Sequence, residues 1–236
     1  MSIWRKVFSR DAAAPADVGR WVVVDTETTG LDVARDTLLA IGGVAVDADG
    51  VLPGDSFEVV LRNAEGSDHD NILVHGIGRH AQRTGVPPAE GLAAFAQWVG
   101  EAQYTGYHTD FDRAVLIRAA GLTKVPLPER AWLDLAPLAA ALAPDKQKKG
   151  GGTLDDWLVA FGIECPVRHN AAADALATAE LLLHLRARAA KQGRNDFAGK
   201  QSKPRKSRID KGPGHIHLAL GQGIAFPSHG LLGPQP

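Results

Sequence analysis

The chain has 236 residues, of which 44% are hydrophobic and 22% are charged, so it can bury a core and is not wholly disordered. No apolar run approaches the ~18 residues of a membrane-spanning helix, and no apolar segment of a secretory signal follows the basic N-terminus. A single cysteine, Cys165, cannot form an internal disulfide. We therefore expect a protein of a reducing, cytoplasmic compartment, without membrane attachment.

The net charge of −1 conceals an uneven distribution. Residues 1–185 hold 16 Lys/Arg and 25 Asp/Glu, whereas residues 186–236 hold 10 and 2. Beyond Lys191 the sequence is rich in Gly, Pro, Ser and Lys, a composition that cannot offset the entropy of ordering. We expect a short lead-in over 1–20, one domain over 21–190 and a disordered basic tail over 191–236. The tail could attract phosphates or serve as a solvated tether, and the composition does not decide between them.

The predicted elements begin with strands. The apolar, β-branched run at 21–25 indicates a buried strand, followed by strand candidates over 37–50 and 56–63, separated by the turn residues Asp49-Gly50 and Pro53-Gly54. Helices and further strands then alternate: we expect helices over 88–100, 110–120, 135–143, 153–161 and 170–190, and strands over 102–107 and 131–135. Gly121 is expected to end the second of these helices, and 145–152 to form a mobile loop. This order predicts an α/β domain with a mixed sheet.

Two carboxylates follow the first strand. Side chains two residues apart in an extended chain point to the same side, so Asp25 and Glu27 are expected to lie together. Like charges this close repel and would take up protons unless a cation lies between them. Ordinary turn chemistry is the alternative, because Asp, Thr and Gly are common after strands.

Two further acids lie on apolar faces of predicted helices. Asp112 has Val115, Leu116 and Ala119 at i+3, i+4 and i+7. Asp174 shares its face with Ala177, Leu181 and Leu185 in the same way. A lone carboxylate among core residues is costly unless it is paired. The alternative is that each acid only favours the dipole at a helix start.

These four acids suit hard divalent cations, Mg²⁺ or Mn²⁺, rather than zinc, because they offer only oxygen ligands. Two such ions about 3.5–4 Å apart are a known arrangement for in-line displacement at phosphodiesters. His169, placed before the cap residue Asn170, could reach the same site and accept a proton from water. A structural or solvated histidine is the alternative.

Three motifs in order, DTETTG, GYHTDFD and RHNAAADALATAELLL, resemble those of the DEDDh 3′–5′ exonucleases. The resemblance spans roughly residues 20–188 and is strongest to the group that contains the proofreading epsilon subunits of bacterial DNA polymerase III. It implies a ribonuclease-H-like fold with a central mixed five-stranded sheet flanked by helices. It also implies metal ligands Asp25, Glu27, Asp112 and Asp174, two bound Mg²⁺ or Mn²⁺ ions, and His169 as general base.

The resemblance further implies contacts with the terminal nucleotide from the segment after the first motif and from ILVHGIG. The residues concerned are Thr28, Thr29, Leu31, His75 and Ile77. For His75, packing within a loop is an equal alternative. The second motif departs from the family's His-Asn, because Tyr107 and His108 stand there, which leaves open how His108 contacts the substrate.

The expected activity is stepwise hydrolysis of 3′-terminal phosphodiesters of DNA, at single strands or frayed ends, to nucleoside 5′-monophosphates. A DNA polymerase subunit is a candidate partner. One alternative keeps the chemistry but acts on small RNAs or oligoribonucleotides. The other is a non-catalytic, polymerase-associated binding subunit, which the complete set of four acids and His169 argues against.

Overall fold

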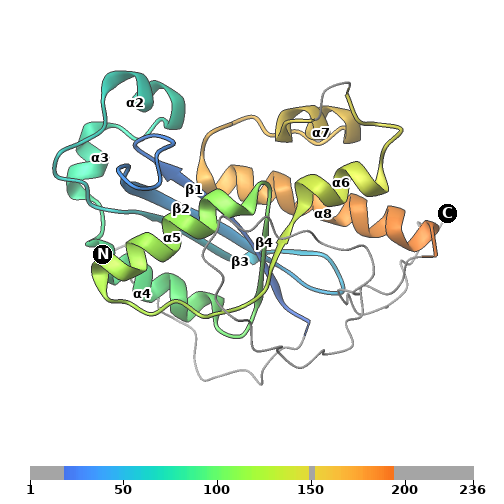
Figure 1. Ribbon diagram of the computed structural model, residues 1–236, viewed down its shortest axis with the longest axis horizontal. Coiled ribbons are helices and arrows are strands. Elements are labelled where there is room, and N and C mark those ends of the chain that lie inside the picture. Colours follow the sequence, from blue (N-terminus) through green and yellow to red (C-terminus); the bar gives the residue numbers. More distant parts are fainter. Residues whose placement is uncertain (1–18, 149–151, 194–236) are drawn as a thin grey trace, which may run out of the picture.

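Five strands form one mixed sheet in the computed structural model, which describes residues 19–148 and 152–193 (Figure 1). The strand order is β3-β2-β1-β4-β5. The central strand β1 pairs antiparallel with β2 and parallel with β4. The strands are β1 (Trp21–Thr28), β2 (Leu38–Val46), β3 (Val51–Val60), β4 (Gln103–Gly106) and β5 (Trp132–Asp134). The predicted mixed five-stranded sheet is confirmed.

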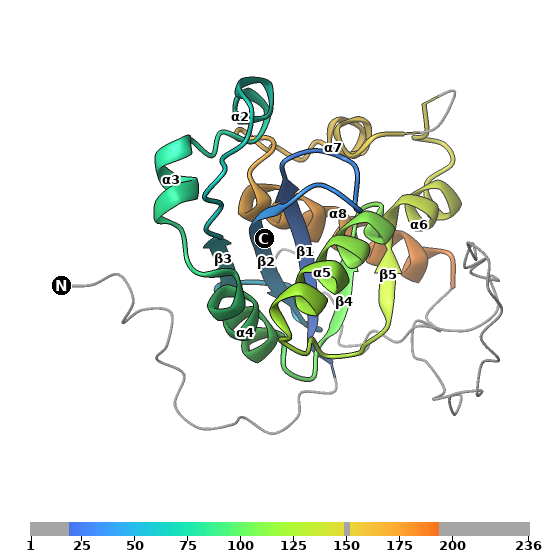
Figure 2. The ribbon, with the colours of Figure 1, turned by 60° about the vertical axis from the view of Figure 1, so that its left-hand side comes forward.

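Helices cover both faces of the sheet. One face carries α4 and α5, and the long helix α8 crosses the other together with α6 and α7 (Figure 2). Two short helices, α2 and α3, lie beyond the ends of β1 and β2 (Figure 1). The helices are α2 (His69–His75), α3 (Arg79–Thr84), α4 (Pro88–Val99), α5 (Thr109–Thr123), α6 (Leu135–Leu142), α7 (Leu154–Phe161) and α8 (Ala171–Lys191).

Strand β1 supplies side chains to both cores. Val22 and Val24 pack with α4 and α5, whereas Val23 packs with α8, and all three are at most 2% exposed. This alternation continues beyond Val24, so Asp25 and Glu27 lie on the α8 side of the sheet and Thr26 on the α5 side. The strand therefore directs its two acids towards α8.

The bounds of several elements differ from the sequence prediction, and β3 begins at Val51 rather than at residue 56. Strand β1 continues through Asp25 and Glu27 to Thr28, because these residues keep their backbone pairing with β2. Gly121 lies inside α5 and does not end it, since an internal Gly costs only about 1 kcal/mol relative to Ala. The helix ends instead at Thr123, and the next residue, Lys124, has a left-handed backbone (φ 58°) and donates its N–H to the carbonyl of Ala120.

The short helices α2 and α3 were not predicted. Both helices are shorter than two full turns, so they are too short to show the apolar periodicity that reveals a long helix. Two signals do mark α2. Asp68 caps its start by accepting a hydrogen bond from the N–H of Asn71, and Gly76 ends it with φ 69°.

The predicted lead-in and basic tail fall almost wholly outside the described residues, as does the centre of the predicted loop at 145–152. The boundaries of the domain therefore stay predictions. Within 19–148 and 152–193, none of the helices has both the length and the apolar character needed to cross a membrane.

Candidate active site

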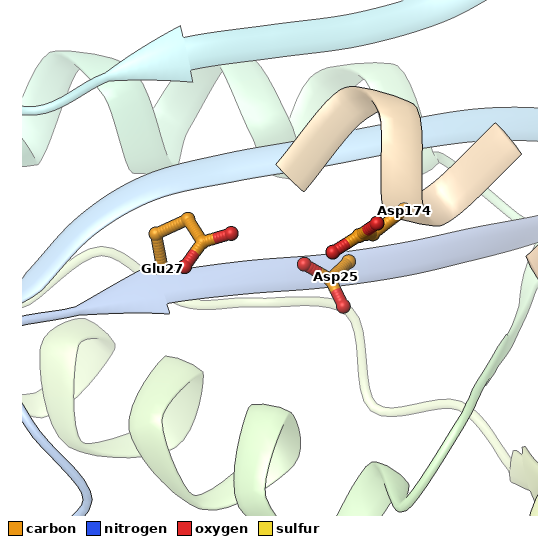
Figure 3. A group of neighbouring side chains, drawn as sticks. All are labelled: Asp25, Glu27 and Asp174. Carbon is orange, nitrogen blue, oxygen red and sulfur yellow. The ribbon is translucent and has the colours of Figure 1, made fainter. Parts of the chain in front are cut away.

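Three of the predicted acids meet at the end of β1. Asp25, Glu27 and Asp174 each offer a carboxylate oxygen, and these oxygens lie within 4.8 Å of one another. Figure 3 shows Asp25 and Glu27 rising from the same side of β1 towards Asp174 on the first turn of α8. The spacing of the two strand acids, read from the sequence, therefore places them together as expected.

The close approach of α8 to the sheet depends on Gly42 of β2, the residue paired with Asp25. A Cβ atom at Gly42 would lie 2.1 Å from the carbonyl carbon of Ala171 and 2.2 Å from the nitrogen of Ala172. The helix begins there because Asn170 caps it, its side chain accepting a hydrogen bond from the N–H of Ala173. Without the close approach of α8 to Gly42, Asp174 would lie farther from Asp25.

Asp112 comes from the opposite face of the sheet, on the first turn of α5. It is 6% exposed, whereas Asp110 is exposed, so the apolar spacing identified the inward-facing acid correctly. Its Oδ1 accepts a hydrogen bond of 2.7 Å from the hydroxyl of Thr26. Asp112 is not among the three residues whose oxygens lie within 4.8 Å of one another, and Thr26 was not predicted to take part.

Burial and mutual repulsion disturb the acids strongly. Burial first, and then the charges of Asp112, Glu27 and Asp174, raise the pKa of Asp25 well above its usual value. Burial and the charges of Asp174 and Asp112 raise the pKa of Glu27 to about 7. Burial also raises the pKa of Asp112 to about 7, although the hydrogen bond from Thr26 opposes this. Asp112, the fourth acid, thus lies close enough to raise the pKa of Asp25 and of Glu27.

Asp174 is held by the turn that precedes α8. The backbone N–H of His169 donates to its Oδ2 at 2.9 Å, and the guanidinium of Arg168 pairs with its Oδ1. His169 is exposed and has a left-handed backbone (φ 58°), so its imidazole lies on the solvent side of the turn. Arg168 was missed by the sequence analysis, because a basic residue beside a motif carries no signal of its target.

A loop between β1 and β2 presents Leu31 to solvent. Leu31 is 86% exposed. Asp36 holds the loop by accepting hydrogen bonds from the Thr29 hydroxyl at 3.0 Å and the Asp32 N–H at 2.7 Å. The side chain of Asn71 on α2 donates to the carbonyl of Thr29, which ties α2 to this loop. Of the residues expected to contact a nucleotide, Thr28 and Thr29 are half-buried and Leu31 projects outward.

His75 and Ile77 lie at the end of α2. His75 is only 5% exposed, and its Nδ1 accepts a hydrogen bond of 3.0 Å from the N–H of Ile77. Nδ1 therefore carries no proton, and the N–H must be at Nε2, which has no hydrogen-bond partner among the described residues. Burial lowers the pKa of His75. A buried, unpartnered donor is compatible both with loop packing and with a ligand.

The altered second motif has a structural explanation. The Tyr107 hydroxyl donates to the carbonyl of Gly152, so this side chain turns towards the start of α7. His108 is exposed, with a left-handed backbone (φ 56°), and its N–H donates to Asp134 at 2.9 Å. Tyr107 thus packs within the protein, and only His108 is left facing solvent at this strand end.

Residues 22–182 match the model of an exonuclease family, the one named after RNase T. The chain belongs to this exonuclease family, and its motifs are of the DEDDh type.

Its relatives include polymerase components. It is 27% identical over 174 residues to the DNA polymerase III PolC-type protein of Bacillus subtilis (strain 168), which covers 73% of this chain and 12% of that protein. It is 29% identical over 177 residues to a DNA polymerase III subunit epsilon-like protein of Rhodobacter capsulatus, covering 74% and 25%. The chain thus spans a quarter or less of these relatives.

Among solved structures, E. coli exonuclease I in complex with a dT13 oligonucleotide superposes with a TM-score of 0.64 at 22% identity. The match covers 74% of this chain and 42% of that one. A further structure of exonuclease I gives a TM-score of 0.65 at 21% identity. The fold is therefore that of exonuclease I, the ribonuclease-H-like fold expected from the motifs.

The residues at the end of β1 fit a divalent cation. Their donors are carboxylate oxygens alone, the donor type that Mg²⁺ and Mn²⁺ prefer. Burial and then mutual repulsion raise the pKa values of Asp25 and Glu27, and a cation between the carboxylates would reduce this cost.

Proposed function

We propose that the chain is a divalent-cation-dependent 3′–5′ exonuclease that removes nucleoside 5′-monophosphates from single-stranded or frayed 3′ ends of DNA. The observation that carries this proposal is the convergence of Asp25, Glu27 and Asp174 within 4.8 Å, in a chain of the exonuclease family. Asp112 approaches from the other face of the sheet, and its charge contributes to the raised pKa of Asp25.

The four acids would hold two Mg²⁺ or Mn²⁺ ions. Ions bound there would offset the negative charge of the scissile phosphate and favour ionisation of water. Thr26 orients Asp112 by donating to its Oδ1. The backbone N–H of His169 fixes Asp174 by donating to its Oδ2.

His169 acts as the general base in this proposal. A neutral imidazole has a pKa near neutral pH and can accept the proton of the attacking water. Its exposed position gives the imidazole room to approach a phosphodiester bound at the acids. Proton transfer then leaves His169 cationic, next to the negative charge of the site, which stabilises it there.

The terminal nucleotide is proposed to lie between the loop after β1 and the end of α2. Leu31 offers an exposed apolar surface on which a base can pack, and Thr28 and Thr29 border the acids. The Nε2–H of His75 is a free donor for the sugar or the 3′-hydroxyl, with Ile77 beside it. His108 is proposed to contact the strand near the phosphate, from the start of α5.

DNA is the proposed substrate because the relatives and structural neighbours are associated with it by name. Two of the relatives are DNA polymerase III proteins, and an exonuclease I structure holds a dT13 oligonucleotide. On the same basis we propose a DNA polymerase subunit as partner. The domain responsible is proposed to span 21–190, within a cytoplasmic protein.

The test compares matched 5′-labelled single-stranded DNA and RNA incubated with the purified chain, with and without Mg²⁺. We expect shortening from the 3′ end with mononucleotide products on DNA, and no product with a chelator or with Asp25→Ala. Asp110→Asn is the matched control, because it removes an exposed acid two residues from Asp112. Faster digestion of RNA would overturn the choice of substrate, and activity unaffected by Asp25→Ala would overturn the site.

A further inference from the structure

Arg168 brings a positive charge directly onto a candidate metal ligand. Its guanidinium pairs with Asp174 through Nη1 and with Asp155 of α7 through Nε. In the part of the chain that the structure describes, 19–148 and 152–193, no other salt bridge reaches Asp25, Glu27, Asp112 or Asp174. The charge of Arg168 also opposes the rise in the pKa of Asp25 and of Glu27, so Arg168 acts on these two acids as well as on Asp174.

The two partners of Arg168 differ in their surroundings. The Asp174 side chain is 6% exposed, whereas that of Asp155 is 60% exposed, and Arg168 lies between them at 25%. The guanidinium therefore bridges the inside of the site and its solvent edge. An arginine has five N–H donors in a rigid fork, which lets it hold two carboxylates at once.

Both oxygens of Asp174 are already engaged. Oδ1 meets Arg168 and, at 3.4 Å, the sulfur of Cys165, and Oδ2 accepts from the N–H of His169. A divalent cation shared by Asp25, Glu27 and Asp174 needs one of these oxygens. Of the three contacts, only the one with Arg168 carries a like charge that repels the incoming ion.

We propose that Arg168 competes with the divalent cation for Oδ1 of Asp174, and that Asp155 retains the displaced guanidinium at the edge of the site. Cation binding then releases the Arg168 guanidinium from Asp174, at the edge of the site where a nucleic-acid phosphate arrives. Arginine binds phosphate in a bidentate manner. Arg168 thus sets the affinity for the cation that the acids hold. This inference rests on the cation site of the proposed function.

Calorimetric titration of the full chain with Mn²⁺ tests this inference without any substrate. Competition predicts that Arg168→Gln binds Mn²⁺ about five- to fiftyfold more tightly than the wild type, because one like charge close to the ion is removed. A merely structural role predicts the opposite, since Asp174 would lose the group that holds it. Equal or weaker binding by Arg168→Gln would therefore overturn the proposal.

The matched control is Arg188→Gln. Arg188 also pairs with an exposed aspartate, Asp145, but lies fourteen residues further along α8, roughly 21 Å from Asp174 at 1.5 Å per residue. Its affinity for Mn²⁺ should stay within about twofold of the wild type. If neither the wild type nor either variant bound Mn²⁺, the cation site of the proposed function would fail as well. That outcome differs from equal binding of Mn²⁺ by the wild type and Arg168→Gln, which would overturn only the competition.

A second measurement uses the unmodified protein, in case Arg168→Gln does not fold. The Nε–H resonance of Arg168, assigned by its loss in Arg168→Lys, is followed by NMR during titration with diamagnetic Mg²⁺. Displacement from Asp174 predicts a saturable shift of this resonance, while the resonance of Arg188 stays in place. A resonance of Arg168 unchanged when the other site residues show saturation would refute the competition.

Discussion

Asp112 and Asp174 are equally buried acids held in different ways. They reach the site from opposite faces of the sheet and are 6% and 4% exposed. Asp112 accepts a hydrogen bond from the neutral hydroxyl of Thr26, whereas Asp174 pairs with the cation Arg168 and accepts the N–H of His169. The pKa of Asp112 rises to about 7, mainly because burial is not offset by a cation. Helix α5 therefore carries an acid, Asp112, that retains its proton readily, whereas α8 carries an acid, Asp174, that is held in an ion pair.

The charges of both acids act on Asp25, and its removal should have the largest effect. We expect Asp25→Ala to lower the rate of 3′-end hydrolysis at least about a thousandfold, a loss of roughly 4 kcal/mol of transition-state stabilisation. Its melting temperature without divalent cations should not fall, because a buried and repelled carboxyl is removed. Single-turnover rates and thermal unfolding monitored by circular dichroism measure both. A large drop in melting temperature would indicate that Asp25 supports the fold.

The hydrogen bond from Thr26 can be removed without touching an acid. Thr26→Val keeps the shape of the side chain but leaves Asp112 buried without its hydroxyl donor, which should cost about 1–3 kcal/mol in unfolding free energy. We expect the rate of hydrolysis to fall about tenfold, since Asp112 is less well oriented. Thr26→Ser retains the hydroxyl and should stay close to the wild type in urea unfolding and in activity. Equal behaviour of the two variants would contradict a role for this bond.

The raised pKa values predict a stability that depends on pH. The pKa of Glu27 rises from 4.5 and that of Asp112 from 3.8, each to about 7, so the folded protein binds more protons than the unfolded chain between these values. Their contribution to stability is full below about pH 4 and is lost as the pH rises to about 7. Urea unfolding at pH 5 and pH 8, without divalent cations, should show the lower free energy at pH 8.

Asp112→Asn should flatten this dependence, because one of the groups with a raised pKa is gone. Mg²⁺ should flatten it in the wild type, since a bound cation favours the ionised carboxylates. Asp110→Asn should leave the dependence unchanged, as that side chain is exposed. A difference between pH 5 and pH 8 that is the same in Asp112→Asn and the wild type would argue against the raised pKa of Asp112.

The smallest effect is expected at the loop that carries Leu31, away from the acids. Asp36→Asn weakens the bonds that hold Thr29 and Asp32, so the loop presents Leu31 less firmly. We expect KM for single-stranded DNA to rise about three- to tenfold, with kcat within about twofold of the wild type. Asp47→Asn, which alters a similar acid in the β2–β3 turn, is the control. A fall in kcat with KM unchanged would place Asp36 in the chemistry instead.

Much of the site could be predicted because it depends on local spacing. The i, i+2 spacing of Asp25 and Glu27 and the i+3, i+4 and i+7 spacing of apolar residues around Asp112 and Asp174 are properties of a single strand or helix. These are the features that the structure places as expected. Their roles in binding metal and substrate, like that of His169, stay predictions.

What was missed depends on how distant segments meet. Thr26 bonds to a residue 86 positions away, and whether it does so is decided by where α5 crosses the sheet. Arg168 could have faced solvent or any acid, and only the turn before α8 directs it to Asp174. Tyr107 is directed to Gly152 by the packing of α7 rather than by its own motif. None of these contacts leaves a periodic signal in the sequence.

Helix α8 and strand β2 lie so close at Gly42 that the absence of a side chain at this residue sets the spacing of the acids. Any larger residue at Gly42 would have to push the backbone at Ala171 and Ala172 outward, because a Cβ would lie only 2.1–2.2 Å from it. Asp174 would move away from Asp25 with the helix. A survey of all substitutions would therefore rank Gly42 among the most intolerant positions, although glycine there has no group that could bind an ion or accept a proton.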